Sequence, residues 1–144
     1  MSAAPDMGLL LDSSILVGAY GHFRPLAELL ETLRTEFGDH ELMLSAITVL
    51  ELEHAFWRAG APGIAVRRRA YLDQLLASVP VQSFTMEIAD LAGHIGAKAL
   101  ELECNIPLAD LQIGATALYF HFDIVASNGA RFEGIPGLKV REMR

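Results

Sequence analysis

The stretch IPLADLQIGATA, residues 106–117, carries the feature around which the rest of the chain is organised. Pro107 suits the first position of a helix, where its missing N–H costs nothing. The residues after it are almost all apolar, so the spacing predicts a helix that is buried on most sides and runs to about Phe120. Asp110 interrupts this apolar surface, and a buried carboxylate is costly unless a cation or hydrogen-bond donors satisfy it. The rest of the chain must therefore supply a partner for Asp110.

The composition of the chain limits the classes of protein to which it can belong. A chain of 144 residues with 52% hydrophobic residues suits one domain, residues 1–144, with a sizeable core. No apolar run reaches the roughly 18 residues of a membrane span, and no basic segment of a signal peptide begins the chain. Cys104 is the only cysteine, which excludes an internal disulfide and makes the cytoplasm the default location. The net charge of −7 argues against a passive nucleic-acid coat.

Hydrophobic periodicity predicts an alternation of strands and helices. Apolar runs predict strands at 8–11, 42–44, 79–84, 123–126 and within 135–140. Amphipathic spacing predicts helices from residue 15, over 24–37, from 45 to about 59, over 64–77, from 85 and from 107. This alternation indicates an α/β domain whose mainly parallel sheet of four or five short strands is covered by helices on both faces.

Three acidic residues are predicted near one edge of that sheet. Asp12 directly follows the first strand, Glu51 lies in the helix after the second strand, and Asp110 opens the helix before the fourth. Ligands bind outside the carboxyl ends of parallel strands, so Asp12 and Asn128 are expected there directly, and Glu51 because its helix starts just past the second strand. Asp110 is expected within reach of them if its helix starts near the same crevice. Each acid also has a local explanation. Asp12 suits a helix N-cap, and the pattern Thr48-x-x-Glu51 is typical of a capping box.

Convergence of three carboxylates would require a cation, because like charges a few ångströms apart repel one another. Mg²⁺ takes oxygen ligands of this kind together with water and phosphate oxygens, and such a site is suited to phosphodiester cleavage. No His/Cys spacing suggests zinc, and no Gly-rich loop with a lysine suggests a nucleotide cradle. The three acids therefore predict a hydrolytic metal site.

Several other residues have simpler predicted roles. Phe56 and Trp57, late in one helix, are expected in the core, with a subunit interface as the alternative. Three adjacent arginines at 67–69 spread around a helix and are expected to be solvated, with contact to a substrate backbone as the alternative for one or two of them. Cys104 is expected to be a buried small hydrophobe.

The chain resembles PIN-domain proteins, particularly the VapC-type toxins of bacterial toxin–antitoxin pairs. The matching segments are spread over the chain in the family's order: LLDSSIL at 10–16, SAITVLEL at 45–52, IGAKAL at 95–100, IPLADLQIGATAL at 106–118 and SNGARFEGIPGLKV at 127–140. The resemblance implies a three-layer α/β/α sandwich and a ribonuclease dependent on Mg²⁺ or Mn²⁺. It places the metal-binding and catalytic acids at Asp12, Glu51 and Asp110, with Ser13 supporting the site.

The last motif of the family is altered in this sequence. The family commonly has Thr-x-Asn and then an acid before Phe, whereas this chain has Ala126, Ser127 and Asn128, with Arg131 before Phe132. Asn128 retains its hydrogen-bonding groups, and Ser127 is a substitute for the lost hydroxyl. Two roles are open for Arg131: contact with a substrate phosphate, or pairing with a metal-site carboxylate. The loss of the acid argues against a second metal site and against full activity.

Partners and alternatives follow from the same resemblance. It implies an RNA substrate, a cognate VapB-type antitoxin that lays a segment into an apolar groove, and a homodimer; no membrane partner is expected. The alternative function is a catalytically weak or inactive PIN-like module that binds RNA or protein. A phosphotransferase of another α/β class ranks last, because Ser14 stands where a dehalogenase-type site has a second Asp.

Overall fold

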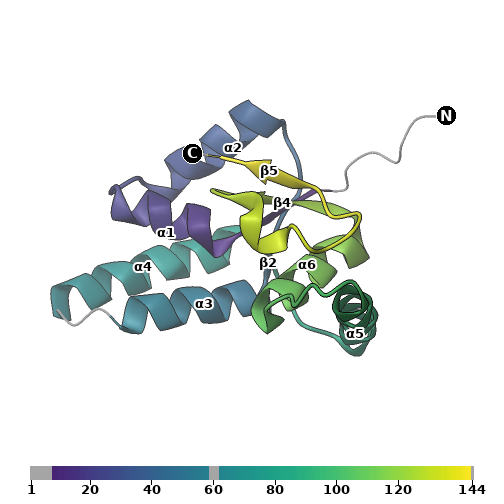
Figure 1. Cartoon of the computed structure of the whole chain (residues 1–144). Coiled ribbons are helices and arrows are strands. Elements are labelled where there is room, and N and C mark those ends of the chain that lie inside the picture. Colours follow the sequence, from purple (N-terminus) through teal and green to yellow (C-terminus); the bar gives the residue numbers. More distant parts are fainter. Residues whose placement is uncertain (1–7, 59–61, 144) are drawn as a thin grey trace.

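The computed structural model describes residues 8–58 and 62–143. This part of the chain contains five strands, six α-helices and one short 3₁₀ helix, η1 (Figure 1). In chain order they are β1 (Gly8–Leu11), α1 (Ser13–Gly21), α2 (Leu26–Phe37), β2 (Leu42–Ser45), α3 (Ala46–Trp57), α4 (Pro62–Ser78), β3 (Val81–Gln82), α5 (Met86–Glu101), α6 (Leu108–Phe120), β4 (Phe122–Ala126), η1 (Gly129–Phe132) and β5 (Val140–Glu142). No helix in the described ranges is long and apolar enough to cross a membrane.

The sheet is parallel throughout, with the strand order β3-β2-β1-β4-β5. The central strand β1 pairs with β2 on one side and with β4 on the other, so that Leu9 lies opposite both Leu42 and Asp123. All four residues of β1 are buried, as expected for a central parallel strand with helices on both faces. The prediction of an α/β fold with a parallel sheet of four or five short strands is confirmed.

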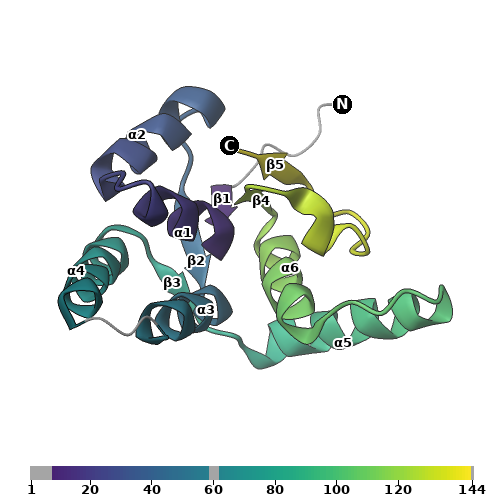
Figure 2. The same cartoon turned by 60° about the vertical axis from the view of Figure 1, so that its left-hand side comes forward.

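Two hydrophobic clusters lie on opposite faces of the sheet because side chains alternate along a strand. Leu9 and Leu11 face the cluster built with α1, α2, α3 and α4. Leu10 faces the opposite cluster, which includes residues of α6 and Phe132. Figures 1 and 2 show the corresponding layers, with α1 to α4 gathered on one side of the sheet and α5 and α6 on the other. This arrangement is the predicted three-layer sandwich.

The start of α3 differs from the prediction. Ser45 is its N-cap, and the Ser45 Oγ accepts a hydrogen bond from the backbone N–H of Ile47 at 3.1 Å. Thr48 therefore lies inside the first turn, where its buried Oγ1 has no hydrogen-bond partner among the described residues. The predicted Thr48-x-x-Glu51 capping box is wrong, because the helix begins at Ala46, two residues before Thr48. Glu51 lies in the second turn, and its carboxylate is free for other contacts.

The two edge strands are shorter or later than predicted. The strand expected at 79–84 is limited to Val81–Gln82, because its partner β2 ends at Ser45, where α3 begins. The last strand, expected within 135–140, begins only at Val140, where β4 offers it Ile124 to pair with. Ile135 is buried in the core without belonging to a strand. In both places the extent of pairing depends on the neighbouring strand.

Two side chains are less buried than predicted. Phe56 lies in the core, but Trp57 is 70% exposed, because one residue along a helix turns a side chain by about 100°. The Trp57 Nε1–H donates to Glu53 at 2.8 Å. Cys104 is half-buried. The predicted helix end near residues 59–60 lies outside the described residues.

Candidate functional site

Three carboxylates from three helices meet at one point. Asp12 follows β1 and caps α1, with its Oδ2 accepting a hydrogen bond from the Ser14 N–H at 3.2 Å. Glu51 belongs to the second turn of α3, and Asp110 to the first turn of α6. All three contact the side chain of Arg131. The acids therefore converge, as expected, and the group on which they converge belongs to the chain itself.

Each guanidinium nitrogen of Arg131 donates to a carboxylate oxygen. The Nη1–H donates to Asp12 Oδ1 at 2.8 Å, and the Nη2–H donates to Glu51 Oε2 at 2.9 Å. The Nε–H donates to Asp110 Oδ1 at 2.8 Å, and Nη2 lies 2.6 Å from the same oxygen. Charge-assisted contacts of this length are among the stronger hydrogen bonds in proteins. Of the two roles left open by the sequence, the structure has Arg131 paired with the carboxylates.

The charged side chains of this cluster are largely buried, so their charges depend on one another. The Asp12 side chain is fully buried, while the side chains of Arg131 and Glu51 are each 25% exposed. Burial by itself lowers the pKa of Arg131, but hydrogen bonds to Glu51 and Asp110 and the charge of Asp12 outweigh it and raise that pKa above its ordinary value. Arg131 therefore stays charged, and one of the three negative charges is balanced.

The backbone of η1 holds Arg131 over the acids. The Asn128 Oδ1 caps η1 by accepting a hydrogen bond from the Ala130 N–H at 2.8 Å. Phe132 is buried in the core, and the guanidinium carbon of Arg131 lies 5.0 Å from the centre of its ring. The Gly129 N–H donates to a carboxylate oxygen of Glu142 on β5 at 3.1 Å. These contacts fix the point from which the Arg131 side chain extends.

The other predicted site residues take positioning roles. The Ser13 hydroxyl donates to Glu51 Oε1 at 3.1 Å, which joins the start of α1 to α3. Ser127 contributes its backbone N–H, which donates to the Ser14 Oγ at 3.1 Å. Ser14 was assigned no role at the site from the sequence. Its position in LLDSSIL, next to Ser13 and two residues after Asp12, could have indicated one. Asn128 acts through the cap of η1 described above.

The donors fit a divalent cation in kind but not in their present arrangement. Carboxylate oxygens with a nearby hydroxyl are the ligands that Mg²⁺ and Mn²⁺ prefer. Within residues 8–58 and 62–143, however, no group of three or more His, Cys, Asp or Glu side chains is arranged to hold a metal ion. The oxygens of Asp12, Glu51 and Asp110 are instead arranged around a planar guanidinium. The site has the chemistry of a cation-binding centre, and Arg131 provides the cation.

Comparison with known proteins gives a consistent result. The family model described as PIN domain matches residues 9–138. No curated protein matches the chain. Among solved structures, VapBC2 from Rickettsia felis bound to a promoter DNA fragment aligns with a TM-score of 0.79 at 20% identity, covering 94% of this chain and 98% of the other. FitAcB from Neisseria gonorrhoeae aligns with a TM-score of 0.75 at 21% identity, covering 92% and 95%. VapBC-5 from Mycobacterium tuberculosis aligns with a TM-score of 0.68 at 20% identity, covering 97% and 99%. The TM-scores of these alignments show that the chain shares the fold of these proteins.

Proposed function

The chain belongs to the PIN-domain family, whose members are generally nucleases, and from this membership we propose that it is a metal-dependent endoribonuclease that hydrolyses RNA phosphodiester bonds. The observation that carries the proposal is the convergence of Asp12, Glu51 and Asp110 from three different helices on one centre. Arg131 balances one of the three negative charges, and the charge that is left attracts a further cation. Divalent-cation binding and hydrolysis of a charged phosphodiester are chemically suited to such a centre.

The proposed roles of the side chains follow from their positions. Asp12, Glu51 and Asp110 hold Mg²⁺ or Mn²⁺, which when bound supplies an activated water and offsets charge on the leaving oxygen. Ser13 orients Glu51 through its hydrogen bond of 3.1 Å. The cap of α1 keeps Asp12 directed at the centre through the Ser14 N–H. Ser127 and Asn128 lie at the start of η1, from which Arg131 reaches the three carboxylates.

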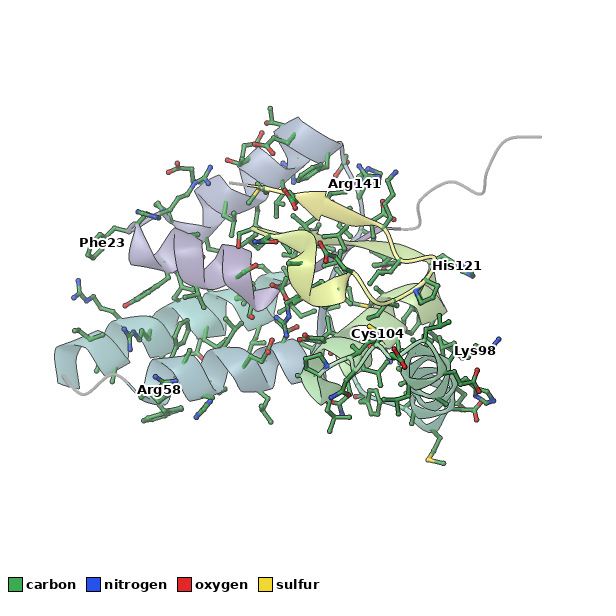
Figure 3. All side chains as sticks on the ribbon, viewed as in Figure 1. Phe23, Arg58, Lys98, Cys104, His121 and Arg141 are labelled. Carbon is green, nitrogen blue, oxygen red and sulfur yellow. The ribbon has the colours of Figure 1, made fainter. Side chains whose placement is uncertain are left out.

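We also propose a VapB-type antitoxin as the partner and the cytoplasm as the location, as in the toxin–antitoxin pairs that this fold resembles. A groove of about 260 Å³ between α1, α3 and α4 offers a surface for an apolar segment of such a partner. It is lined by Val17, Tyr20, Gly21, Phe23, Ala55, Phe56, Ile64, Arg67 and Arg68. Phe23 is 83% exposed and points away from the end of α1 (Figure 3). Homodimerisation is proposed from the same resemblance.

A second function is favoured by one observation. The guanidinium of Arg131 lies where a metal ion would have to bind, so the chain also suits a PIN-like module that binds RNA or protein without cleaving RNA. The two functions predict different behaviour toward divalent cations and toward RNA. A single pair of variants separates them.

The test compares wild type with Asp110→Asn and a control, Asp90→Asn, on the exposed surface of α5. We expect wild type to cut a structured RNA only with Mn²⁺ or Mg²⁺. Asp110→Asn should lose metal binding by more than the roughly 10–100-fold that loss of an outer-shell partner costs, and should lose cleavage with it. Asp90→Asn should match wild type. Calorimetry measures binding, gel assays measure cleavage, and circular dichroism confirms that each variant is folded.

Three outcomes are informative. Cleavage by Asp110→Asn at the wild-type rate would contradict the assignment of the site. Cleavage that persists in a chelator would contradict metal dependence. Metal binding without cleavage of several different RNAs would favour the non-cleaving module.

A further inference from the structure

We propose that Arg131 is an internal occupant of the cation position, so that a divalent cation binds Asp12, Glu51 and Asp110 only by displacing the Arg131 side chain. The proposal rests on the proposed function in one respect: it assumes that these carboxylates are the metal ligands. It goes beyond that function because it makes metal binding a competition with a residue of the same chain.

The argument begins with the carboxylate oxygens that are in use. Arg131 donates to Asp12 Oδ1, Glu51 Oε2 and Asp110 Oδ1, and its Nη1–H also lies 3.5 Å from Glu51 Oε1. Asp12 Oδ2 and Glu51 Oε1 accept hydrogen bonds from the Ser14 N–H and the Ser13 hydroxyl. For Asp12, the oxygen directed at the common centre is therefore the one bound to the guanidinium, and for Glu51 both oxygens are in contact with it. A metal ion that bridges the three acids needs the same oxygens.

The charge left on the carboxylates attracts a divalent ion toward the position that Arg131 occupies. With Arg131 in place, the cluster keeps two unbalanced negative charges, which still attract a divalent ion. An ion at the common centre would, however, lie within a few ångströms of the guanidinium in a partly buried site, where repulsion between like charges is weakly screened. The two cations compete for one position and cannot both occupy it. The attraction therefore favours replacement of the Arg131 guanidinium by the divalent ion over binding of the ion beside it.

Exchange requires the Arg131 side chain to leave and the carboxylate side chains to close on the ion, but it requires no movement of the main chain of η1. The capped backbone of η1 and the buried ring of Phe132 hold the main chain in place. The Arg131 side chain is 25% exposed, so it lies at the surface side of the cluster and has a route to solvent. By this route a divalent cation from solution can compete for the carboxylates.

The test is Mn²⁺ calorimetry on wild type and on Arg131→Gln. The control, Arg34→Gln, removes one positive charge at an exposed ion pair on α2. If Arg131 competes with the metal, Arg131→Gln should bind Mn²⁺ about tenfold or more tightly than wild type, whereas Arg34→Gln should match wild type. Equal affinity in wild type and Arg131→Gln would overturn the proposal.

The same titrations separate failure of this proposal from failure of the proposed function. Equal affinity that is lost in Asp110→Asn would refute the competition and leave the metal site intact. No binding by wild type and none by Arg131→Gln would refute both.

A second measurement uses wild type alone, in case Arg131→Gln does not fold. The Nε–H resonance of Arg131 is expected to be protected from solvent exchange by Asp110, and to lose that protection as Mg²⁺ saturates the site. Protection that survives saturation with Mg²⁺ would overturn the proposal.

Discussion

Ser45 and Thr48 lie three residues apart at the start of α3, and both side chains are buried. The Ser45 hydroxyl satisfies the Ile47 N–H, whereas the Thr48 Oγ1 has no hydrogen-bond partner among the described residues. A buried hydroxyl without a partner has lost its hydration and gained nothing in return. The two residues, similar in sequence terms, therefore contribute to stability with opposite sign.

Substitution separates these roles. Thr48→Val should leave the free energy of unfolding unchanged or raise it, because the methyl group fills the space of an unsatisfied hydroxyl. Ser45→Ala should lower that free energy by about 1 kcal/mol through loss of the N-cap. Urea unfolding followed by circular dichroism measures both. A larger loss in Thr48→Val than in Ser45→Ala would mean that Thr48 is the capping residue after all.

At the scale of elements, α6 is packed closely on both sides. It lies between the sheet and α5 (Figure 2). A Cβ placed on Gly96 of α5 would come within 2.9 Å of Leu111 Cδ2, and one placed on Gly114 of α6 would overlap Ile135 Cδ1. Ile135 follows η1 by only three residues, so the contact between α6 and this segment helps to set the position of η1 and hence of Arg131.

Gly114→Ala should therefore destabilise the protein although alanine is the better helix former. Overpacking of this kind costs about 1–3 kcal/mol, against a gain in helix propensity of about 1 kcal/mol. The control is Gly93→Ala in the interior of α5, where an added Cβ meets nothing within 4 Å and the melting temperature should rise. Thermal unfolding compares the two variants. If Gly114→Ala melts at or above the temperature of Gly93→Ala, the close packing around Ile135 does not constrain α6.

At the scale of the whole molecule, one side chain joins four segments. Arg131 extends from η1 and binds residues at the starts of α1 and α6 and in the second turn of α3. These elements lie on both faces of the sheet and belong to both hydrophobic clusters. Removing a cation from a set of buried carboxylates leaves uncompensated charge, which is strongly destabilising.

In the absence of divalent cations, Arg131→Gln should lower the free energy of unfolding by about 3 kcal/mol. Hydrogen exchange should quicken together at the starts of α1, α3 and α6. Arg34→Gln, at an exposed pair, should change the free energy by less than about 1 kcal/mol. Denaturant unfolding and exchange mass spectrometry provide the measurements. Faster exchange confined to η1 would show that Arg131 does not hold these segments together.

Local sequence was sufficient for most of the architecture. Apolar runs such as residues 8–11, and helix starts such as Thr85 and Pro107, depend on neighbours within a few positions, and the structure has a strand or a helix at each of them. The parallel α/β arrangement followed because strands that alternate with helices leave few other ways to bury both faces of a sheet. Local pattern also placed Asp12 and Glu51 near one edge of the sheet, since each closely follows a strand, whereas the position of Asp110 relative to that edge depended on how the fold places α6.

Only the tertiary structure decided how far the edge strands extend and what the acids bind. The length of β3 and the start of β5 depend on the strands beside them, which a local pattern does not contain. Arg131 is separated from Asp110 by 21 residues, from Glu51 by 80 and from Asp12 by 119. An arginine side chain is long, flexible and equally suited to a phosphate, a carboxylate or solvent. Arg131 binds three carboxylates because of where the fold places η1, since electrostatic attraction acts through space and not along the sequence.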